Sequence, residues 1–316
     1  MSHSGTDALP VEVRHDLAHV PLSPPSRTSG VLEVFRRRYL LRLMVRREIK
    51  ARYAGTGFGL AWSYINPLTR FLTFYIVFGI VLGRGMGLEY FAIHLFAGMV
   101  MVNYFTETVT AGTRSLLSNK GVIGKMAMPR EMFPVASMLV SLWHAIPQLI
   151  ILLVACLMTG WLGEAPPWVP DAVGMGAAVL GFALIMVYGT AFGLMFSCVN
   201  VIFRDFGRIV QTFINMVPFT VPMMYPYWMI SERFGRFEPY YLLNPVAEAV
   251  MLIQRGFWYP TCAHTCSYDP ATNAALPEFP GDLYSRGFVM LGVGLVLLVA
   301  GQLVFARLEK TIPERL

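Results

Sequence analysis

A dense group of cations lies directly before the first apolar run of this chain. Its members are Arg46, Arg47, Lys50 and Arg52. Guanidinium and ammonium groups beside a membrane bind the phosphates of lipid head groups, and equally those of a substrate that carries phosphate. Two interpretations stay open: an anchor that fixes orientation, and a gate helix for a phosphate-bearing substrate.

A further pair of charges lies inside apolar runs. Arg70 is ten residues into the first run, about 15 Å along a helix, and Glu107 is near the end of the second. Charges in hydrocarbon are costly and usually face a protein interior or a cavity. We predict an ion pair between them, with a substrate phosphate as the alternative partner of Arg70. His94 and His144 lack metal-ligand spacing, so we expect structural roles for both.

Aromatic side chains gather in two of the apolar runs. The set comprises Tyr64, Phe71, Phe74, Tyr75, Phe219, Tyr225 and Tyr227. Such residues form the interfacial belt of a membrane protein, or they present ring faces along which sugars slide. The sequence leaves both interpretations open.

The chain has four cysteines. Cys156 and Cys198 lie in apolar runs and are expected to be packing residues. Cys262 and Cys266 lie in an outer loop, where a local disulfide is favoured over a metal site with His264. No metal site is therefore expected.

Catalytic signatures are absent from the sequence. It has no GxxxxGK phosphate loop, no nucleophile elbow and no HExxH pair. We expect neither catalytic residues nor a cofactor in this chain. If it transports actively, its ATPase must be another chain.

Composition identifies the elements that position these residues. Of 316 residues, 55% are hydrophobic and only 14% are charged, whereas a soluble domain has about a quarter charged residues. The mean hydropathy is +0.54. The class is therefore a polytopic membrane protein. The formal charge of +6 does not indicate nucleic acid, because the cations lie beside the apolar runs.

Six stretches reach the roughly 20 apolar residues that span a membrane. They are residues 60–83, 90–112, 133–162, 172–199, 209–230 and 287–306. An all-α membrane protein with six transmembrane helices is predicted, because backbone polar groups in lipid must be satisfied internally. The predicted domains are a disordered cytoplasmic tail (1–30), a cytoplasmic interfacial helix (31–59), a transmembrane domain (60–306) and a cytoplasmic tail (307–316).

Positive charge predicts the topology. Cations precede the first span, lie between the second and third and between the fourth and fifth, and follow the sixth. The alternate connections are poorer in Lys and Arg. Both termini are therefore predicted to be cytoplasmic.

The last outer connection, residues 231–285, is long and contains a semi-apolar block at 240–258. Asn244 and Pro245 break this block, since proline ends one helix and starts another. Re-entrant or interfacial outer helices are the prediction.

The cytoplasmic connection 113–132 contains a short polar helix between breakers. It is either an ordinary positively charged loop or, because of Val122 and Ile123, a segment that docks into a partner groove.

Four segments together resemble one family. They are REIKARYAGTGFGLAWSYINPL, SLLSNKGVIGKMAMPREMFP, NVIFRDF and YYLLNPVAEAVMLIQRGFW, in this order. The chain resembles, over residues 33–312, the membrane subunits of type-2 ABC exporters for polysaccharides, the permeases for O-antigen, capsule, teichoic acid and galactan. The resemblance implies a homodimer with two ATP-binding subunits, which hold ATP and Mg. It also implies export of a polyprenyl-diphosphate-linked glycan across the cytoplasmic (inner) membrane.

The resemblance also implies roles for residues. The coupling helix seated on the ATPase would contain Asn119, Lys120, Val122, Ile123, Lys125, Pro129 and Arg130. The lipid-diphosphate gate would comprise Arg46, Arg47, Lys50 and Arg52, with Arg70 beyond them, and the outer helices would cover the exit.

Three other functions compete with glycan export. The same fold could export a drug, an antibiotic or a simple lipid. A membrane-embedded lipid-linked sugar transferase would need clustered acids at a membrane face, and the cytoplasmic side shows none. An ion channel would need polar pore stripes or a filter-like loop. Expected partners are an ATP-binding subunit, a second copy, a lipid-linked glycan and membrane lipids, but no nucleic acid.

Overall fold

The computed structural model describes residues 30–55, 57–81, 87–123, 128–161, 168–262, 266–269 and 272–308. These residues form helices and no strand; two isolated antiparallel bridges join Leu88 to Ser267 and Tyr268 to Ala275. The α-helices are α2 (Gly30–Arg36), α3 (Arg38–Tyr53), α4 (Trp62–Phe74), α5 (Phe91–Ser118), α6 (Lys120–Ile123), α7 (Met132–Trp161), α8 (Ala172–Ile202), α9 (Phe206–Ile214), α10 (Tyr227–Phe234), α11 (Glu238–Tyr241), α12 (Pro245–Phe257) and α13 (Leu283–Leu308). A π-helix, η3 (Tyr75–Val81), continues α4, and 3₁₀ turns are η2 (Gly59–Ala61), η5 (Val217–Phe219), η6 (Gly235–Phe237) and η7 (Tyr259–Thr261).

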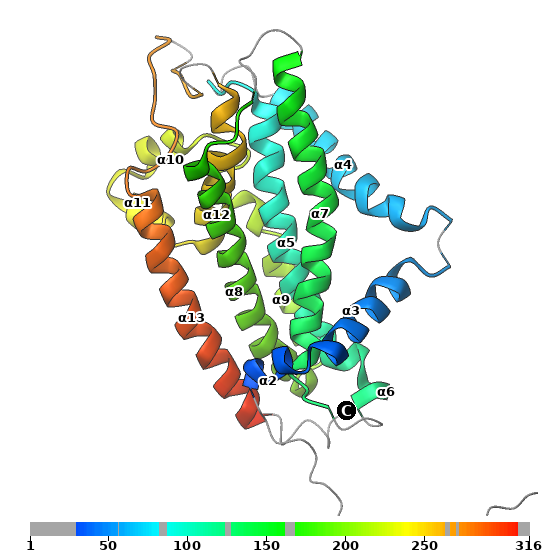
Figure 1. Cartoon of the computed structure of the whole chain (residues 1–316). Helices are drawn as coiled ribbons and strands as arrows, with labels where there is room; N and C mark the ends of the chain where they lie inside the picture. The colour runs from blue at the N-terminus through cyan, green and yellow to red at the C-terminus, as the bar shows by residue number, and fades with distance from the viewer. Residues whose placement is uncertain are drawn as a thin grey trace, which may run out of the picture.

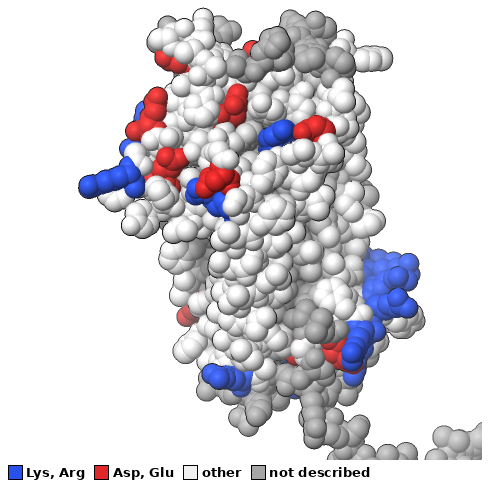
Figure 2. Space-filling view, turned by 60° about the vertical axis from the view of Figure 1, so that its left-hand side comes forward, with Lys and Arg blue, Asp and Glu red and all other residues white. Residues whose placement is uncertain are grey.

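Four helical segments in the described ranges are long and apolar enough to cross a membrane. They are Trp62–Val81 (α4 with η3), α7, α8 and α13. Figure 2 shows charged side chains at the two ends of the molecule, with a wide uncharged face between them. Such a belt matches the hydrocarbon layer of a bilayer, and the chain is an integral membrane protein.

The prediction of six spans is met only in part. Residues 90–112 do form a helix, α5, but its polar side chains keep it outside the apolar set. Residues 209–230 are not one continuous helix. The chain leaves α9 at Ile214, makes the short turn η5, and begins α10 only at Tyr227. Pro218, Pro222 and Pro226 remove backbone donors along this stretch, which accounts for the break.

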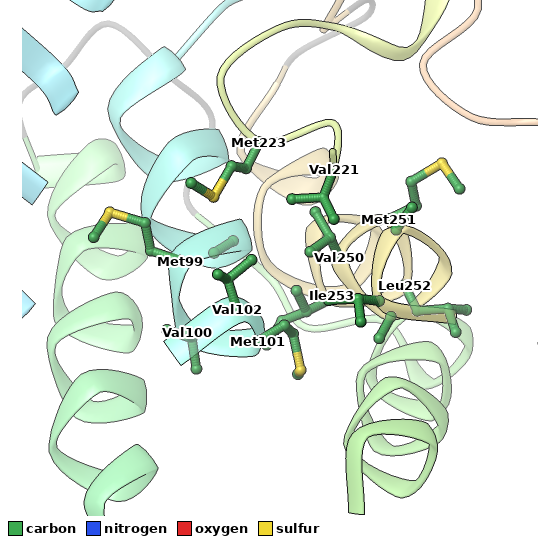
Figure 3. Packing of buried hydrophobic residues seen from close by; sticks show 14 of the residues in the cluster. Met99, Val100, Met101, Val102, Val221, Met223, Val250, Met251, Leu252 and Ile253 are labelled. Carbon is green, nitrogen blue, oxygen red and sulfur yellow. The ribbon is translucent and has the colours of Figure 1, made fainter. Parts of the chain in front are cut away.

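The centre of the bundle is built on α5, α8 and α12 (Figures 1 and 3). Met101 and Val102 of α5 face Val250 and Ile253 of α12 in one buried cluster, while Met99 extends from the other side of α5 (Figure 3). Helices α5 and α8 approach most closely where two glycines face each other. A Cβ at Gly112 would lie 2.8 Å from the Cα of Gly193. Small residues at such crossings let helix backbones approach closely in a membrane protein.

A second buried cluster lies at the lower end in Figure 1, where α2 and α3 pack against the lower parts of α5, α7, α8 and α13. Leu41 and Met44 of α3 are buried there, while Arg42 and Arg46 on the same helix are exposed. Helix α3 is therefore amphipathic and packs on α7 through its apolar side. The predicted interfacial segment is in fact two helices, because the chain turns at Arg37 between α2 and α3.

The outer connection folds differently from a surface cap. Helix α11 ends at Tyr241 and α12 starts at Pro245, with the Asn244 side chain accepting a hydrogen bond from the Val246 amide at 3.0 Å. Almost all of α12 is buried, against α5, α8 and α13. It is a core helix of the upper half of the bundle, and the prediction of re-entrant or interfacial outer helices stays a prediction.

Candidate functional site

One cavity of about 750 Å³ lies between the α3–α4 arm and the bundle. In Figure 1, α3 and α4 lean away from α5 and α7 on one side of the molecule. The cavity is lined by Arg52, Tyr53, Trp62, Ser63, Asn66, Pro67, Arg70, Thr73, Phe74, Met99, Val102, Asn103, Thr106, Glu107, Thr110, Ala111, Arg114, His144, Gln148, Gln211, Ile214, Asn215, Pro218, Phe219 and Met223.

Its charged lining is mostly cationic. Three arginines from different helices line it, Arg52 of α3, Arg70 of α4 and Arg114 of α5, against the single carboxylate of Glu107. Arginine presents planar donors that match phosphate and carboxylate groups. The cavity therefore favours an anionic group with polar neighbours.

Glu107 joins three helices at the cavity wall. Its Oε1 accepts a hydrogen bond from Arg52 Nη1 and lies 2.7 Å from His144 Nδ1. Arg52 Nη1 also lies 2.9 Å from that ring nitrogen. His144 is 5% exposed, whereas the Arg52 side chain is 51% exposed. The end of α3 is thereby tied to α5 and α7 by a contact that is open to the cavity on its Arg52 side.

A chain of amides continues this network. Arg70 Nη1 donates to Asn103 Oδ1 at 3.4 Å, Asn103 Nδ2 donates to Gln148 Oε1 at 2.9 Å, and Gln148 donates to the His144 carbonyl at 3.2 Å. The predicted Arg70–Glu107 ion pair is therefore wrong. Arg70 instead donates to Asn103, which is one helical turn from Glu107 on α5. Glu107 pairs with Arg52 of α3.

The cavity contains only part of the predicted gate. Arg52 and Arg70 line it. Arg46, Arg47 and Lys50 are exposed on α3 and lie outside the set of lining residues. A helix turns about 100° per residue, so neighbouring cations on α3 cannot all face one cavity.

The sequence analysis named Glu107 and His144 but missed the lining residues Asn103, Thr110, Arg114 and Gln148, although a signal for them exists. Asn103, Glu107, Thr110 and Arg114 are spaced by four, three and four residues, which places them on one face of a helix. His144 and Gln148 repeat this spacing on α7. A polar stripe on an otherwise apolar helix indicates a cavity wall.

Most of the predicted pathway aromatics belong to the core. Only Phe74 and Phe219 line the cavity, with their rings edge to face at 6.5 Å. Phe71 packs on Phe96, and Tyr75 stacks with Phe91. The others are fixed by contacts elsewhere: the Tyr225 hydroxyl donates to the Phe219 carbonyl and the Tyr227 hydroxyl donates to Glu238. Tyr64 is half-buried on α4.

The predicted coupling segment lies at the lower end of the bundle. Lys120 is exposed at the start of α6, followed by the half-buried Val122 and Ile123. Asn119 and Pro129 are buried and Arg130 is half-buried; Lys125 lies outside the described residues.

Asn119 links this segment to α3. Its Nδ2 donates to Glu48 Oε1 at 3.4 Å and to the Ser115 carbonyl at 3.0 Å. Burial raises the pKa of Glu48 above its ordinary value, while the Asn119 hydrogen bond and the Arg47 charge oppose this rise. The helix with the gate cations and the segment with the predicted coupling residues are thus directly hydrogen-bonded.

The upper end contains a disulfide between Cys262 and Cys266, with their Cα atoms 5.5 Å apart. Cys156 and Cys198 are free and buried. Within the described ranges, no group of three or more His, Cys, Asp or Glu residues could hold a metal ion. The arginine and amide side chains that line the cavity can bind and orient a polar anion.

The fold and the site define an integral membrane protein, an all-helical bundle with a cationic cavity beside the α3–α4 arm. The family model described as "ABC-2 type transporter" matches residues 39–258 of this chain. This protein belongs to the ABC-2 type transporter family, so it is a transporter membrane subunit rather than a catalytic enzyme.

Individual relatives are distant in sequence but long in coverage. The chain is 25% identical over 228 residues to the O-antigen export system permease protein RfbA of Myxococcus xanthus, covering 72% of this chain and 84% of the relative. It is 23% identical over 264 residues to the protein of that name from Klebsiella pneumoniae, covering 82% and 90%. It is 21% identical over 207 residues to the polysialic acid transport protein KpsM of Escherichia coli, covering 65% and 76%.

Proposed function

We propose that this chain is the membrane subunit of an ATP-driven exporter that moves a polysaccharide carried on a polyprenyl diphosphate out of the cytoplasm. The cavity beside α3 is the observation that carries the proposal. Three arginines and a series of amides there face a space of about 750 Å³ at the junction of an amphipathic helix and the bundle. Relatives named for O-antigen export and polysialic acid transport support a glycan as the cargo.

The two ends of the cavity support different parts of such a substrate. At the α3 end, Arg52, Arg70 and Arg114 offer donors to a diphosphate. At the η5 end, Phe74 and Phe219 offer ring faces to sugar C–H groups. A lipid tail would remain in the bilayer, because α3 and α4 contact the bundle at α7 but lean away from it on one side of the molecule (Figure 1).

Topology follows from charge. The cations before α4, around the start of α9, in the α5–α7 connection and at the end of the chain support a cytoplasmic lower end by the positive-inside rule. Both termini are then cytoplasmic and the disulfide lies outside, in a compartment that permits it. The membrane is the cytoplasmic, or inner, membrane.

Two kinds of partner complete the transporter. A separate ATP-binding subunit holds ATP and Mg and docks on α6 and its neighbours, because this chain has no phosphate loop of its own. A second copy of the chain completes the pathway, since α4 is barely covered: only 6% of its apolar window is buried.

The cavity assignment is tested by charge removal in the complex with its ATPase. Arg52→Gln, Arg70→Gln and Arg114→Gln should each lower the affinity for a polyprenyl-diphosphate glycan about 10-fold or more, since a charged hydrogen bond contributes about 1.5–3 kcal/mol. Arg208→Gln is the matched control, because its side chain is 88% exposed and outside the cavity.

The outcome also separates cargo classes. A glycan that accumulates in the cytoplasm of cells lacking the gene, and binding that is lost in the three variants but kept in the control, support the proposal. Unchanged glycan binding in all four proteins would refute the site. Binding of an uncharged drug or a simple lipid with no response to the arginine changes would favour the alternative cargo.

A further inference from the structure

Glu248 is a fully buried acid far from the cavity described above. It lies on α12 and has no exposed surface. A Cβ added at Gly287 of α13 would lie 3.6 Å from Glu248 Oε1, 2.8 Å from Leu180 and 3.3 Å from Leu252. The carboxyl group is thus enclosed where α12 meets α8 and α13, beside leucine side chains and the bare backbone of a glycine.

No group in the described protein satisfies this carboxyl. Neither Oε1 nor Oε2 of Glu248 has a hydrogen-bond partner. The nearby charges are Asp282 and Arg286 at the start of α13, and these bind each other, with Arg286 Nη2 donating to Asp282 Oδ2 at 2.6 Å. Asp282 therefore holds Arg286 through Nη2, while Arg286 Nε is buried and has no hydrogen-bond partner; no hydrogen bond joins it to Glu248.

The other helices packed on α12 offer no counter-charge. Helix α8 contains no Asp, Glu, Lys, Arg or His. On α5, His94 faces a different part of α12, where its ring lies 3.3 Å from Gln254 Nε2. A metal ion is also disfavoured, because the described residues hold no group of three candidate ligands.

An ionised carboxylate in such surroundings is far more costly than a neutral one. Burial raises the pKa of Glu248 from 4.5 to about 8; Arg286 opposes this rise and Asp282 adds to it. Protonation replaces a buried charge with a much weaker dipole.

We propose that Glu248 is a proton-binding site: its carboxyl group holds a proton while α12 packs against α8 and α13, and gives that proton to water when these helices separate. The site is independent of the cargo and of the arginine cavity. Any movement that separates α12 from α13 then releases one proton, and a higher pH favours the separated state.

The direct test is infrared spectroscopy of the full-length protein in lipid at about pH 7, where carboxyl groups with ordinary pKa values are ionised. The carbonyl stretching band of a protonated carboxyl group should be present in the native protein, lost in Glu248→Gln and retained in Glu232→Gln. Glu232 is exposed on α10 and loses the same charge. Glu131, which is also buried but accepts a hydrogen bond from Gln302 at 3.1 Å, is common to all three proteins.

A second measurement does not depend on a variant that folds. The same band, shifted by isotope-labelled glutamate, should fade in the native protein as the pH rises through about 8. Spectra that are identical in native and Glu248→Gln proteins, or a glutamate band that is absent at neutral pH, would overturn the proposal.

Stability gives the third readout, and its sign is fixed. Between the pKa of the unfolded glutamate, 4.5, and the raised value of about 8, the packed state binds one proton more than the unfolded state. Stability must therefore fall as the pH rises through that window. Glu248→Gln should remove this part of the fall in melting temperature, whereas equal slopes in the two proteins would contradict the site.

Discussion

Glu107 controls which donors of the cavity are free to bind a ligand. Its Oε1 bonds both Arg52 and His144, whereas Arg70 bonds only the side-chain amide oxygen of Asn103, at 3.4 Å, among the described contacts of the cavity. An anion that enters the cavity therefore meets Arg70 and Arg114 at lower cost than Arg52, because binding to Arg52 must compete with an internal carboxylate.

The strength of that contact is measurable. A double-mutant cycle of Arg52→Gln and Glu107→Gln should give a coupling energy of about 1 kcal/mol, because the arginine is half exposed and solvent screens the pair. Titration with a denaturing detergent supplies the free energies of unfolding. The same cycle with Arg70 in place of Arg52 should give a coupling near zero, since Arg70 bonds Asn103.

Glu48 predicts a pH effect on the attachment of α3. Burial raises its pKa above 4.5, so the folded state holds extra proton just above that pH, and this contribution to stability is lost as the pH rises. Glu48→Gln keeps an acceptor for Asn119 and should flatten the fall in melting temperature just above pH 4.5. A slope equal to that of the native protein would show that Glu48 is not buried as described.

At the scale of elements, the crossing of α5 and α8 determines the shape of the bundle. Glycines at the crossing bring the two backbones together, and the polar stripe of α5 then faces the cavity on the other side of the helix. The rotation of α5 about its axis therefore sets both its packing on α8 and the polar side chains that face the cavity.

That crossing gives a sharp glycine test. Gly112→Ala should lower the free energy of unfolding by about 1–3 kcal/mol, because its Cβ would lie 2.8 Å from the backbone of Gly193. Gly176→Ala on α8 is the control, with no atom within 4 Å of its Cβ. It should be neutral or slightly stabilising, since alanine favours helix more than glycine does. Equal melting temperatures for the two variants would contradict the close approach.

Helix α6 carries the prediction on coupling. Replacing Lys120–Ile123 with a Gly/Ser linker should abolish export driven by the partner ATPase while membrane insertion continues, because the side chains that we predict to dock on the ATPase are lost. Transport by reconstituted vesicles and the amount of inserted protein are the two measurements. Export at the normal rate would show that the partner docks elsewhere.

At the scale of the whole molecule, Figure 2 shows acidic and basic side chains in the upper part and mostly basic ones in the lower part, so we predict that the lower end faces the cytoplasm. A cysteine placed at Glu232 should react with a membrane-impermeant thiol reagent applied from outside, and a cysteine at Arg208 should react only after the membrane is opened. The native background is low, because two cysteines are buried and two are bonded. The reverse labelling pattern would show that the topology is opposite to the predicted one.

Much of the architecture could be predicted from local sequence. Residues 60–83, 133–162, 172–199 and 287–306 correspond to the apolar segments that the structure contains, because hydropathy over about 20 residues is a property of the segment alone. The fifth span failed because its mean hydropathy conceals three prolines that interrupt the helix. Of the five predicted gate residues, only Arg52 and Arg70 line the cavity, because a cluster along the chain is not a cluster in space; the gate itself stays a prediction.

By itself, the sequence determined the class of protein and the helices that cross the membrane, since both follow from composition and from periodicity within single segments. Only the tertiary structure decided which side chains contact each other across helices. Arg52 and not Arg70 meets Glu107, His144 joins them from α7, and α12 is buried in the core with Glu248 enclosed. These outcomes depend on the rotation and depth of one helix against another, and many side chains far apart in the sequence fix those two quantities together.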